Sequence, residues 1–138
     1  MHFSLVDRVL HCDGERIVTL KSVSASEEYL QDHFPTFPIL PGVFMLEAMV
    51  QAARELLSRR DPALARHVLG SVRALKYGSL VRPGDSLRIE AALMKSSEPG
   101  HFEFRATATT IRPDHSEDPA PPQAASGRFS LREPRPIG

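Results

Sequence analysis

Three prolines close together, at positions 35, 38 and 41, constrain the fold of this chain more than any other feature. Proline has no amide hydrogen and fixes φ, so this stretch cannot be helical and must be extended or turning. The residues that follow are mostly helix formers such as alanine, leucine and methionine. The pattern therefore predicts a helix from about Gly42 to Ser58, with the basic pair Arg59-Arg60 at its end and Asp61-Pro62 as its stop.

The predicted helix is apolar on nearly all sides. Between positions 43 and 53 only Glu47 and Gln51 are polar. A helix of this kind is a buried one, so we expect the rest of the chain to wrap around it. The other segments favour strands, because apolar and polar residues alternate in them and turn signals separate them. The expected strands cover about residues 3–11, 17–20, 67–77, 87–93, 102–108 and 127–132.

This order of elements predicts an α+β fold in which an antiparallel β-sheet wraps around one long central helix. A length of 138 residues suits a single domain, 1–138. Segment 112–126 holds four prolines and is expected to be a flexible loop.

Composition excludes several classes of protein. Lys+Arg and Asp+Glu are equal at 17 each, so net charge favours neither nucleic acid nor membrane as a partner. The single cysteine, Cys12, cannot form an internal disulfide, and no apolar run is long enough to span a membrane. We therefore expect a soluble cytoplasmic protein. The six histidines show no spacing typical of a metal site, so no metal is expected.

Glu47 is an unusual residue for an apolar helix, because a carboxylate is rarely buried unless it is paired. Gln51 follows at i+4 on the same face. Glu47 could be a structural residue bonded to Gln51 or to an arginine from elsewhere. It could equally be a general acid or base in apolar surroundings. The residues alone leave both open.

His33 precedes the rigid proline-rich stretch that leads to the start of the predicted helix. The first amides of a helix, here after Pro41-Gly42, have no partner within the helix and can polarise a carbonyl oxygen. A base, an acid and amide donors within fifteen residues form a coherent candidate site for proton transfer.

The segment His33-Phe-Pro-x-x-Pro-Ile-x-Pro-Gly-Val-x-x-x-Glu47-Ala resembles the active-site signature of the FabZ-type (3R)-hydroxyacyl-acyl-carrier-protein dehydratases. Further matches flank it, at Leu5 to Val9, at Lys76-Tyr77 and at Val81 to Asp85. The resemblance implies a hotdog fold and a homodimer, with possible assembly into a trimer of dimers. It also implies that the two catalytic residues of each site come from different subunits and that no cofactor is used.

The resemblance assigns roles to individual residues. His33 would abstract the C2 proton of a 3-hydroxyacyl thioester, and Glu47 would protonate the departing hydroxyl. Gly42 and Val43, at the helix start, would bind the substrate and stabilise its oxyanion, with Gln51 in support. The product would be a trans-2-enoyl thioester on acyl carrier protein, in fatty-acid or specialised acyl or polyketide-like biosynthesis.

The resemblance also gives a candidate partner for a basic segment. Residues 51–90 carry eight basic and four acidic side chains. Acyl carrier proteins are acidic, and basic side chains would steer one toward the site. The candidate docking residues are Arg59, Arg60, Arg66, Arg73 and Lys76.

Three residues depart from the family pattern: Asp32, Thr36 and Phe37 stand where a glycine and a Gly-His pair are usual. These changes favour a divergent paralogue with its own substrate range. Two other functions compete with dehydration, namely hydrolysis of the thioester by a hotdog thioesterase and a non-catalytic acyl-carrier-binding subunit.

Overall fold

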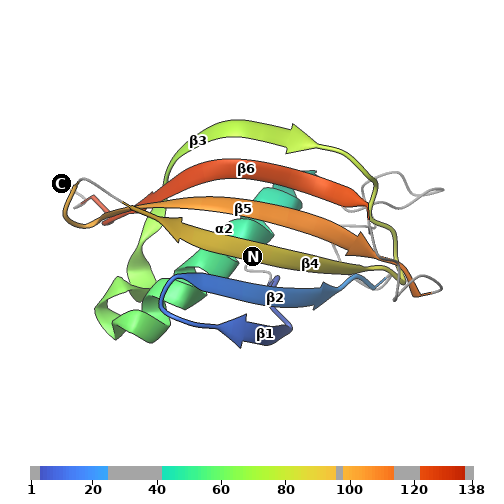
Figure 1. Ribbon diagram of the computed structural model, residues 1–138, viewed down its shortest axis with the longest axis horizontal. Coiled ribbons are helices and arrows are strands. Elements are labelled where there is room, and N and C mark those ends of the chain that lie inside the picture. Colours follow the sequence, from blue (N-terminus) through green and yellow to red (C-terminus); the bar gives the residue numbers. More distant parts are fainter. Residues whose placement is uncertain (1–3, 25–41, 96–97, 114–121, 136–138) are drawn as a thin grey trace.

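The computed structural model (Figure 1) describes residues 4–24, 42–95, 98–113 and 122–135. In this part of the chain six strands form one antiparallel sheet in the order β1-β2-β4-β5-β6-β3. One α-helix and one short 3-10 helix accompany it within the same residues. The elements are β1 (Arg8–Cys12), β2 (Arg16–Ser22), α2 (Gly42–Arg60), η1 (Pro62–Arg66), β3 (Val68–Tyr77), β4 (Ser86–Met94), β5 (His101–Ile111) and β6 (Gln123–Arg132).

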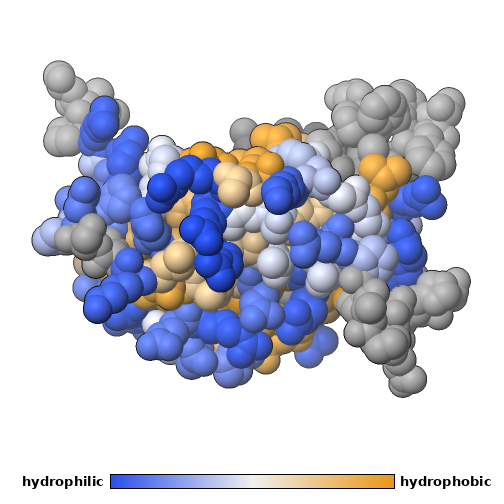
Figure 2. All heavy atoms as spheres, turned by 45° about the horizontal axis from the view of Figure 1, so that its top comes forward, coloured by the Kyte–Doolittle hydropathy of each residue, from blue (hydrophilic) through white to orange (hydrophobic). Residues whose placement is uncertain are grey.

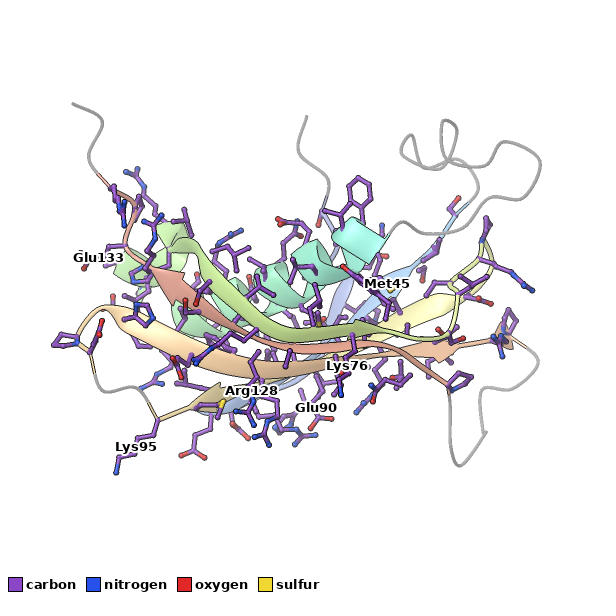
Figure 3. The ribbon with its side chains drawn as sticks, turned by 90° about the horizontal axis from the view of Figure 1, so that it is seen from above. Met45, Lys76, Glu90, Lys95, Arg128 and Glu133 are labelled. Carbon is purple, nitrogen blue, oxygen red and sulfur yellow. The ribbon has the colours of Figure 1, made fainter. Side chains whose placement is uncertain are left out.

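Helix α2 lies across one face of the curved sheet, which wraps around it (Figures 1 and 3). The helix begins at Gly42, as expected, and continues to Arg60. Its buried side chains are Met45, Ala48, Met49, Val50, Ala52, Ala53, Leu56 and Leu57. Complete burial of one leucine contributes about 2 kcal/mol, so this apolar surface is what holds the sheet against the helix.

Apolar and polar residues alternate along the strands, and the apolar face of the sheet is the one that contacts the helix. In β4, Leu87, Ile89 and Ala91 are buried, whereas Arg88 and Glu90 point to the other face. In β5, Phe104 and its alternate neighbours Ala106 and Ala108 are buried in the same way. The predicted α+β arrangement, an antiparallel sheet around one long helix, is confirmed.

The side chain of Asp13 shapes the hairpin between β1 and β2, which was expected at Asp13-Gly14. Asp13 Oδ1 accepts hydrogen bonds from the amides of Glu15 and Arg16, both at 2.8 Å. Asp13 Oδ2 lies 2.9 Å from His11 Nε2. The bond from His11, with those from the two amides, lowers the pKa of Asp13 to about 2.

Strand β3 lies at one edge of the sheet and pairs only with β6 among the described strands. The pairing shifts register twice, between Leu69 and Val72 and between Arg73 and Lys76. Each shift places one extra residue in β3, which is the pattern of a β-bulge. Ala74, inside the second bulge, has a positive φ of 54°. This edge strand is therefore irregular at the end that leads to Tyr77.

The expected loop over residues 112–126 is shorter than predicted. Strand β6 begins at Gln123, and Ala124 and Ala125 are buried in it. Four prolines suggested a loop throughout, but the last of them, Pro122, lies just before the strand, where it removes no ladder hydrogen bond. Residues 114–121 lie outside the described part.

Among the described residues, no helix is both long enough and apolar enough to cross a lipid bilayer.

Candidate active site

One half of the predicted site can be examined in the structure. Glu47, Gly42, Val43 and Gln51 are all on α2, whereas His33 lies outside the described residues. The described residues therefore contain the proposed acid and the start of the helix.

Glu47 is half-buried and is held by the residue one turn further along α2. Gln51 Nε2 donates a hydrogen bond of 3.3 Å to Glu47 Oε1. Gln51 Oε1 in turn accepts a hydrogen bond of 2.8 Å from the amide of Leu5. Because an amide N–H can only donate, this contact fixes the carboxamide oxygen toward Leu5 and turns the NH₂ group toward Glu47.

This arrangement bears on the two interpretations of Glu47. The bond to Gln51 confirms the expected i+4 contact, and no arginine among the described residues pairs with the carboxylate. A carboxylate offers about four acceptor sites on two oxygens, and the bond from Gln51 occupies one of them on Oε1. The bond from Gln51 thus orients the carboxyl group, and within the described part of the chain no basic side chain forms an ion pair with it.

The start of α2 is packed against an aromatic ring. A Cβ atom added to Gly42 would lie 2.9 Å from both Cε1 and Cζ of Tyr77. The close approach of the ring explains why glycine suits this position, although its φ is not among the positive values. The first amides of α2 have no acceptor within the helix itself, and their N–H groups point out of this end of it.

Exposed apolar side chains gather at the same end of the molecule. Val43 is 65% exposed, Tyr77 52% and Leu80 44%, and they follow directly from the helix start and from the end of β3. Single surface apolar residues need no explanation, but three beside one helix start indicate a surface that covers an apolar partner or ligand.

The five candidate docking residues are divided between two places. Arg59 and Arg60 are at the C-terminal end of α2, and Arg66 ends η1. Arg73 and Lys76 lie on the edge strand β3, and Figure 3 shows Lys76 on the face of the sheet away from the helix. The structure therefore does not bring all five together as one surface.

A groove of about 640 Å³ runs beside α2 and is mainly polar. Its lining includes Gln51, Arg54 and Glu55, and does not include Glu47 or Gly42. A polar lining of this kind does not suit the apolar chain of an acyl group. Within the described residues, no group of three His, Cys, Asp or Glu side chains could hold a metal ion.

Two site features were absent from the sequence-based prediction. Tyr77 was noticed only as part of a flanking motif, and nothing near it in sequence indicates that it touches Gly42. The Leu5 amide, which orients Gln51, carries no sequence signal, because a backbone group looks the same at every position.

Comparison with known proteins decides the family. The ApeI-like family, described as ApeI dehydratase, matches residues 10–114. The chain belongs to the ApeI-like dehydratases. A curated 3-hydroxyacyl-[acyl-carrier-protein] dehydratase FabZ from Ruminiclostridium cellulolyticum is 38% identical over 96 residues, which cover 68% of this chain and 68% of that protein. The FabZ of Latilactobacillus sakei is 44% identical over 93 residues, with 66% of each chain covered.

This ApeI-like dehydratase also has the expected fold. The ApeI:P dehydratase heterocomplex from Xenorhabdus doucetiae has a TM-score of 0.64 at 17% identity, with 96% of this chain and 100% of that chain covered. At this identity the likeness concerns the fold, and it confirms the hotdog arrangement. The two sequence relatives are dehydratases, so the FabZ-type resemblance and the assignment as a hydro-lyase are confirmed, and the two competing functions are not favoured.

Proposed function

We propose that this ApeI-like dehydratase removes water from (3R)-hydroxyacyl groups carried on acyl carrier protein and produces trans-2-enoyl thioesters. The observation that carries the proposal is the Gln51-oriented carboxyl of Glu47, which lies just over one turn into a helix whose first amides, from Gly42 on, have no acceptor within the helix itself. The pathway is fatty-acid biosynthesis or a specialised acyl pathway.

The reaction needs a base, an acid and an oxyanion donor. His33 takes the proton from C2, and the electron pair of that bond forms the C2–C3 double bond. The C3–O bond breaks as Glu47 delivers a proton to the hydroxyl, so that water leaves. The amides at Gly42 and Val43 stabilise the negative charge that develops on the thioester oxygen. Transfer of the proton from His33 back to Glu47, through water or product, restores both groups.

Each step in this scheme moves a proton between the enzyme and the substrate or an electron pair within the substrate. Neither an external oxidant nor a metal is required, so the proposed enzyme works without a cofactor of its own. The carrier protein supplies the thioester on its phosphopantetheine arm. The reaction takes place in the cytoplasm.

The assembly that we propose is a homodimer whose two sites are each shared between subunits, with possible association into a trimer of dimers. Two features support it. Strand β3 leaves one edge open among the described strands, and an open edge is a template for pairing with another chain. Val43, Tyr77 and Leu80 leave apolar surface exposed beside the proposed site.

The test of the reaction uses a crotonyl thioester and the ultraviolet band of the enoyl group. Hydration removes this band without release of thiol, whereas a thioesterase releases thiol and a non-catalytic subunit does neither. We expect hydration by the wild-type protein. Release of thiol, or complete inertness at high enzyme concentration, would contradict the proposal.

Replacement of Glu47 by glutamine keeps the shape of the side chain and removes its transferable proton. We expect Glu47→Gln to lower the rate by about 10²-fold or more, because general acid catalysis contributes on this scale. Glu55→Gln is a matched control, since Glu55 is on the same helix and pairs with Arg59 at 3.0 Å. Near-normal turnover by Glu47→Gln would remove the acid role.

A further inference from the structure

The face of the sheet that points away from α2 carries a row of arginines. In the antiparallel register, Arg105 of β5 lies directly opposite Arg128 of β6, and Arg128 lies directly opposite Arg73 of β3. Lys76 lies opposite Ser126, the next outward position of β6. Figure 3 shows Arg128 and Lys76 on this outer side, and Figure 2 shows hydrophilic side chains across the middle of the face. We call Arg73, Lys76, Arg105 and Arg128 the outer-face cluster.

Acidic side chains neutralise only part of this face. Glu90 pairs with Arg16 at 2.8 Å and with Arg88 at 3.5 Å, and Glu103 pairs with Arg73 at 3.0 Å. Among the described residues, Lys76, Arg105 and Arg128 have no acidic partner, and all three are exposed. Like charges directly opposite one another on a sheet are destabilising, so this arrangement does not serve the stability of the fold.

The irregular backbone of β3 is what completes the cluster. In a regular strand, residues three positions apart point to opposite faces. The bulge between Arg73 and Lys76 adds one residue, and both side chains therefore lie on the outer face. The bulge contains Ala74 at a φ of 54°, a left-handed conformation that is unfavourable for a non-glycine residue.

A shallow depression of about 200 Å³ lies within the cluster. Its lining includes Lys76, Arg105 and Arg128 together with the hydroxyl-bearing residues Thr107 and Ser126, and it includes no acidic residue. Cations and hydroxyl groups around one hollow are a donor surface that suits carboxylates or phosphate oxygens.

We infer that the outer-face cluster is the docking surface for the acidic face of the acyl carrier protein, an inference that rests on the proposed function. A small, positively charged area with a shallow depression matches a short acidic helix. Glu90 and Glu103 lie on the same face and would repel a long polyanion such as nucleic acid, and the chain as a whole has no net charge. A protein with a local acidic face fits this pattern better.

The position of the cluster connects it with the proposed site. Lys76 points outward, and the next residue, Tyr77, points inward and packs against Gly42 at the start of α2. Neighbouring Cα atoms are about 3.8 Å apart, so the docking surface adjoins the end of β3 that borders the helix start. A carrier protein bound there would present its arm beside the exposed apolar residues Val43 and Leu80.

The experiment compares two substrates with the same acyl group. One is a 3-hydroxyacyl group on acyl carrier protein, and the other is the same group on N-acetylcysteamine, which lacks the protein. We expect the double variant Arg105→Glu/Arg128→Glu to lower kcat/KM for the carrier-bound substrate about tenfold or more at low salt. Its kcat/KM for the small thioester should stay at the wild-type value, because the side chains do not contact the acyl group.

A matched control makes the same change in charge elsewhere on the surface. Arg8→Glu/Lys95→Glu alters two exposed cations on β1 and just after β4, and it should leave both substrates unaffected. An equal effect of both double variants would show general electrostatics and would overturn the assignment. If only Arg59→Glu/Arg60→Glu lowered kcat/KM for the carrier-bound substrate, docking would lie at the end of α2, and the assignment to the outer-face cluster would be overturned.

Binding measurements separate failure of this inference from failure of the proposed reaction. Calorimetry with apo acyl carrier protein reports docking whether or not turnover occurs. If Arg105→Glu/Arg128→Glu no longer binds the carrier protein, the outer-face cluster is supported as the docking surface, even if neither substrate is dehydrated. Unchanged carrier binding overturns it, and so does a result in which the variant loses affinity only for a duplex oligonucleotide.

Discussion

Replacement of Gly42 by alanine sets two effects of opposite sign against each other. Glycine is less favourable than alanine by up to about 1 kcal/mol in a helix interior and by less at the first residue, which is the place of Gly42, and Gly42 lacks the positive φ that would make alanine strained. Propensity alone therefore predicts a more stable protein. The structure predicts the reverse, because the new Cβ would lie 2.9 Å from Cε1 and Cζ of Tyr77 and 3.3 Å from its Cδ1.

The size of the effect follows from how far the ring can move. Carbon atoms without a bond between them prefer about 3.5–4.0 Å, so the ring must shift by several tenths of an ångström. Overpacking typically costs about 1–3 kcal/mol. Tyr77 is 52% exposed and can yield, which places the cost near the lower half of that range. After the gain in propensity, we expect Gly42→Ala to lower the free energy of unfolding by about 1 kcal/mol and Tm by about 4 °C.

Urea denaturation of four proteins measures the coupling between the two residues: wild type, Gly42→Ala, Tyr77→Ala and the double variant. In the Tyr77→Ala background the added methyl group meets no ring, so Gly42→Ala should be neutral or stabilising there. An alanine at position 42 that stabilises the wild-type protein would refute the argument. The argument would also be refuted if Gly42→Ala still lowered the free energy of unfolding in the Tyr77→Ala background.

Three further predictions concern the site and the core. Equal amounts of His33→Ala and Glu47→Gln subunits, once shown to exchange, should regain about a quarter of wild-type activity, because about half of the dimers are mixed and each has one intact site of two. No recovery would exclude shared sites. Gln51→Leu should lower kcat by about tenfold in the crotonyl thioester assay, since it removes the donor that orients Glu47; an unchanged kcat would show that the carboxyl needs no such support. Thr19→Val should raise the free energy of unfolding in urea by about 1–2 kcal/mol, because Thr19 Oγ1 is buried without a partner among the described residues. A destabilised Thr19→Val protein would mean that the hydroxyl is bonded.

The helix and the strands could be predicted because local patterns determine them. The end of the proline-rich stretch and the apolar run that follows it mark the start of α2 at Gly42, and alternation marks the buried face of β4. The start of β6 was missed because the prolines nearby dominated the pattern, although Ala124 and Ala125 are buried in the strand. Alanine has only a weak preference for strands, so two alanines next to prolines do not predict that a strand includes them.

The contacts around the site show where sequence reasoning reaches its limit. The bond between Glu47 and Gln51 follows from helical spacing alone. The packing of Tyr77 on Gly42 depends on how the end of β3 meets the helix, which no local pattern encodes. Arg105 and Arg128 are far apart in sequence, and only the register of β5 and β6 makes them neighbours. The sequence-based docking group consequently included Arg73 and omitted both.

The extra residue in the second bulge of β3 has a consequence for insertions and deletions. Removal of one residue between Arg73 and Lys76 would turn the bulge into a regular strand, in which Lys76 still lies opposite Ser126 and keeps its outward direction. Insertion of a further residue that leaves the bulge at one extra residue would instead exchange the faces of Lys76 and Tyr77. The outer charge and the inner aromatic contact depend on the same count of residues, so such an insertion would disrupt both at once, whereas a substitution could alter either one separately.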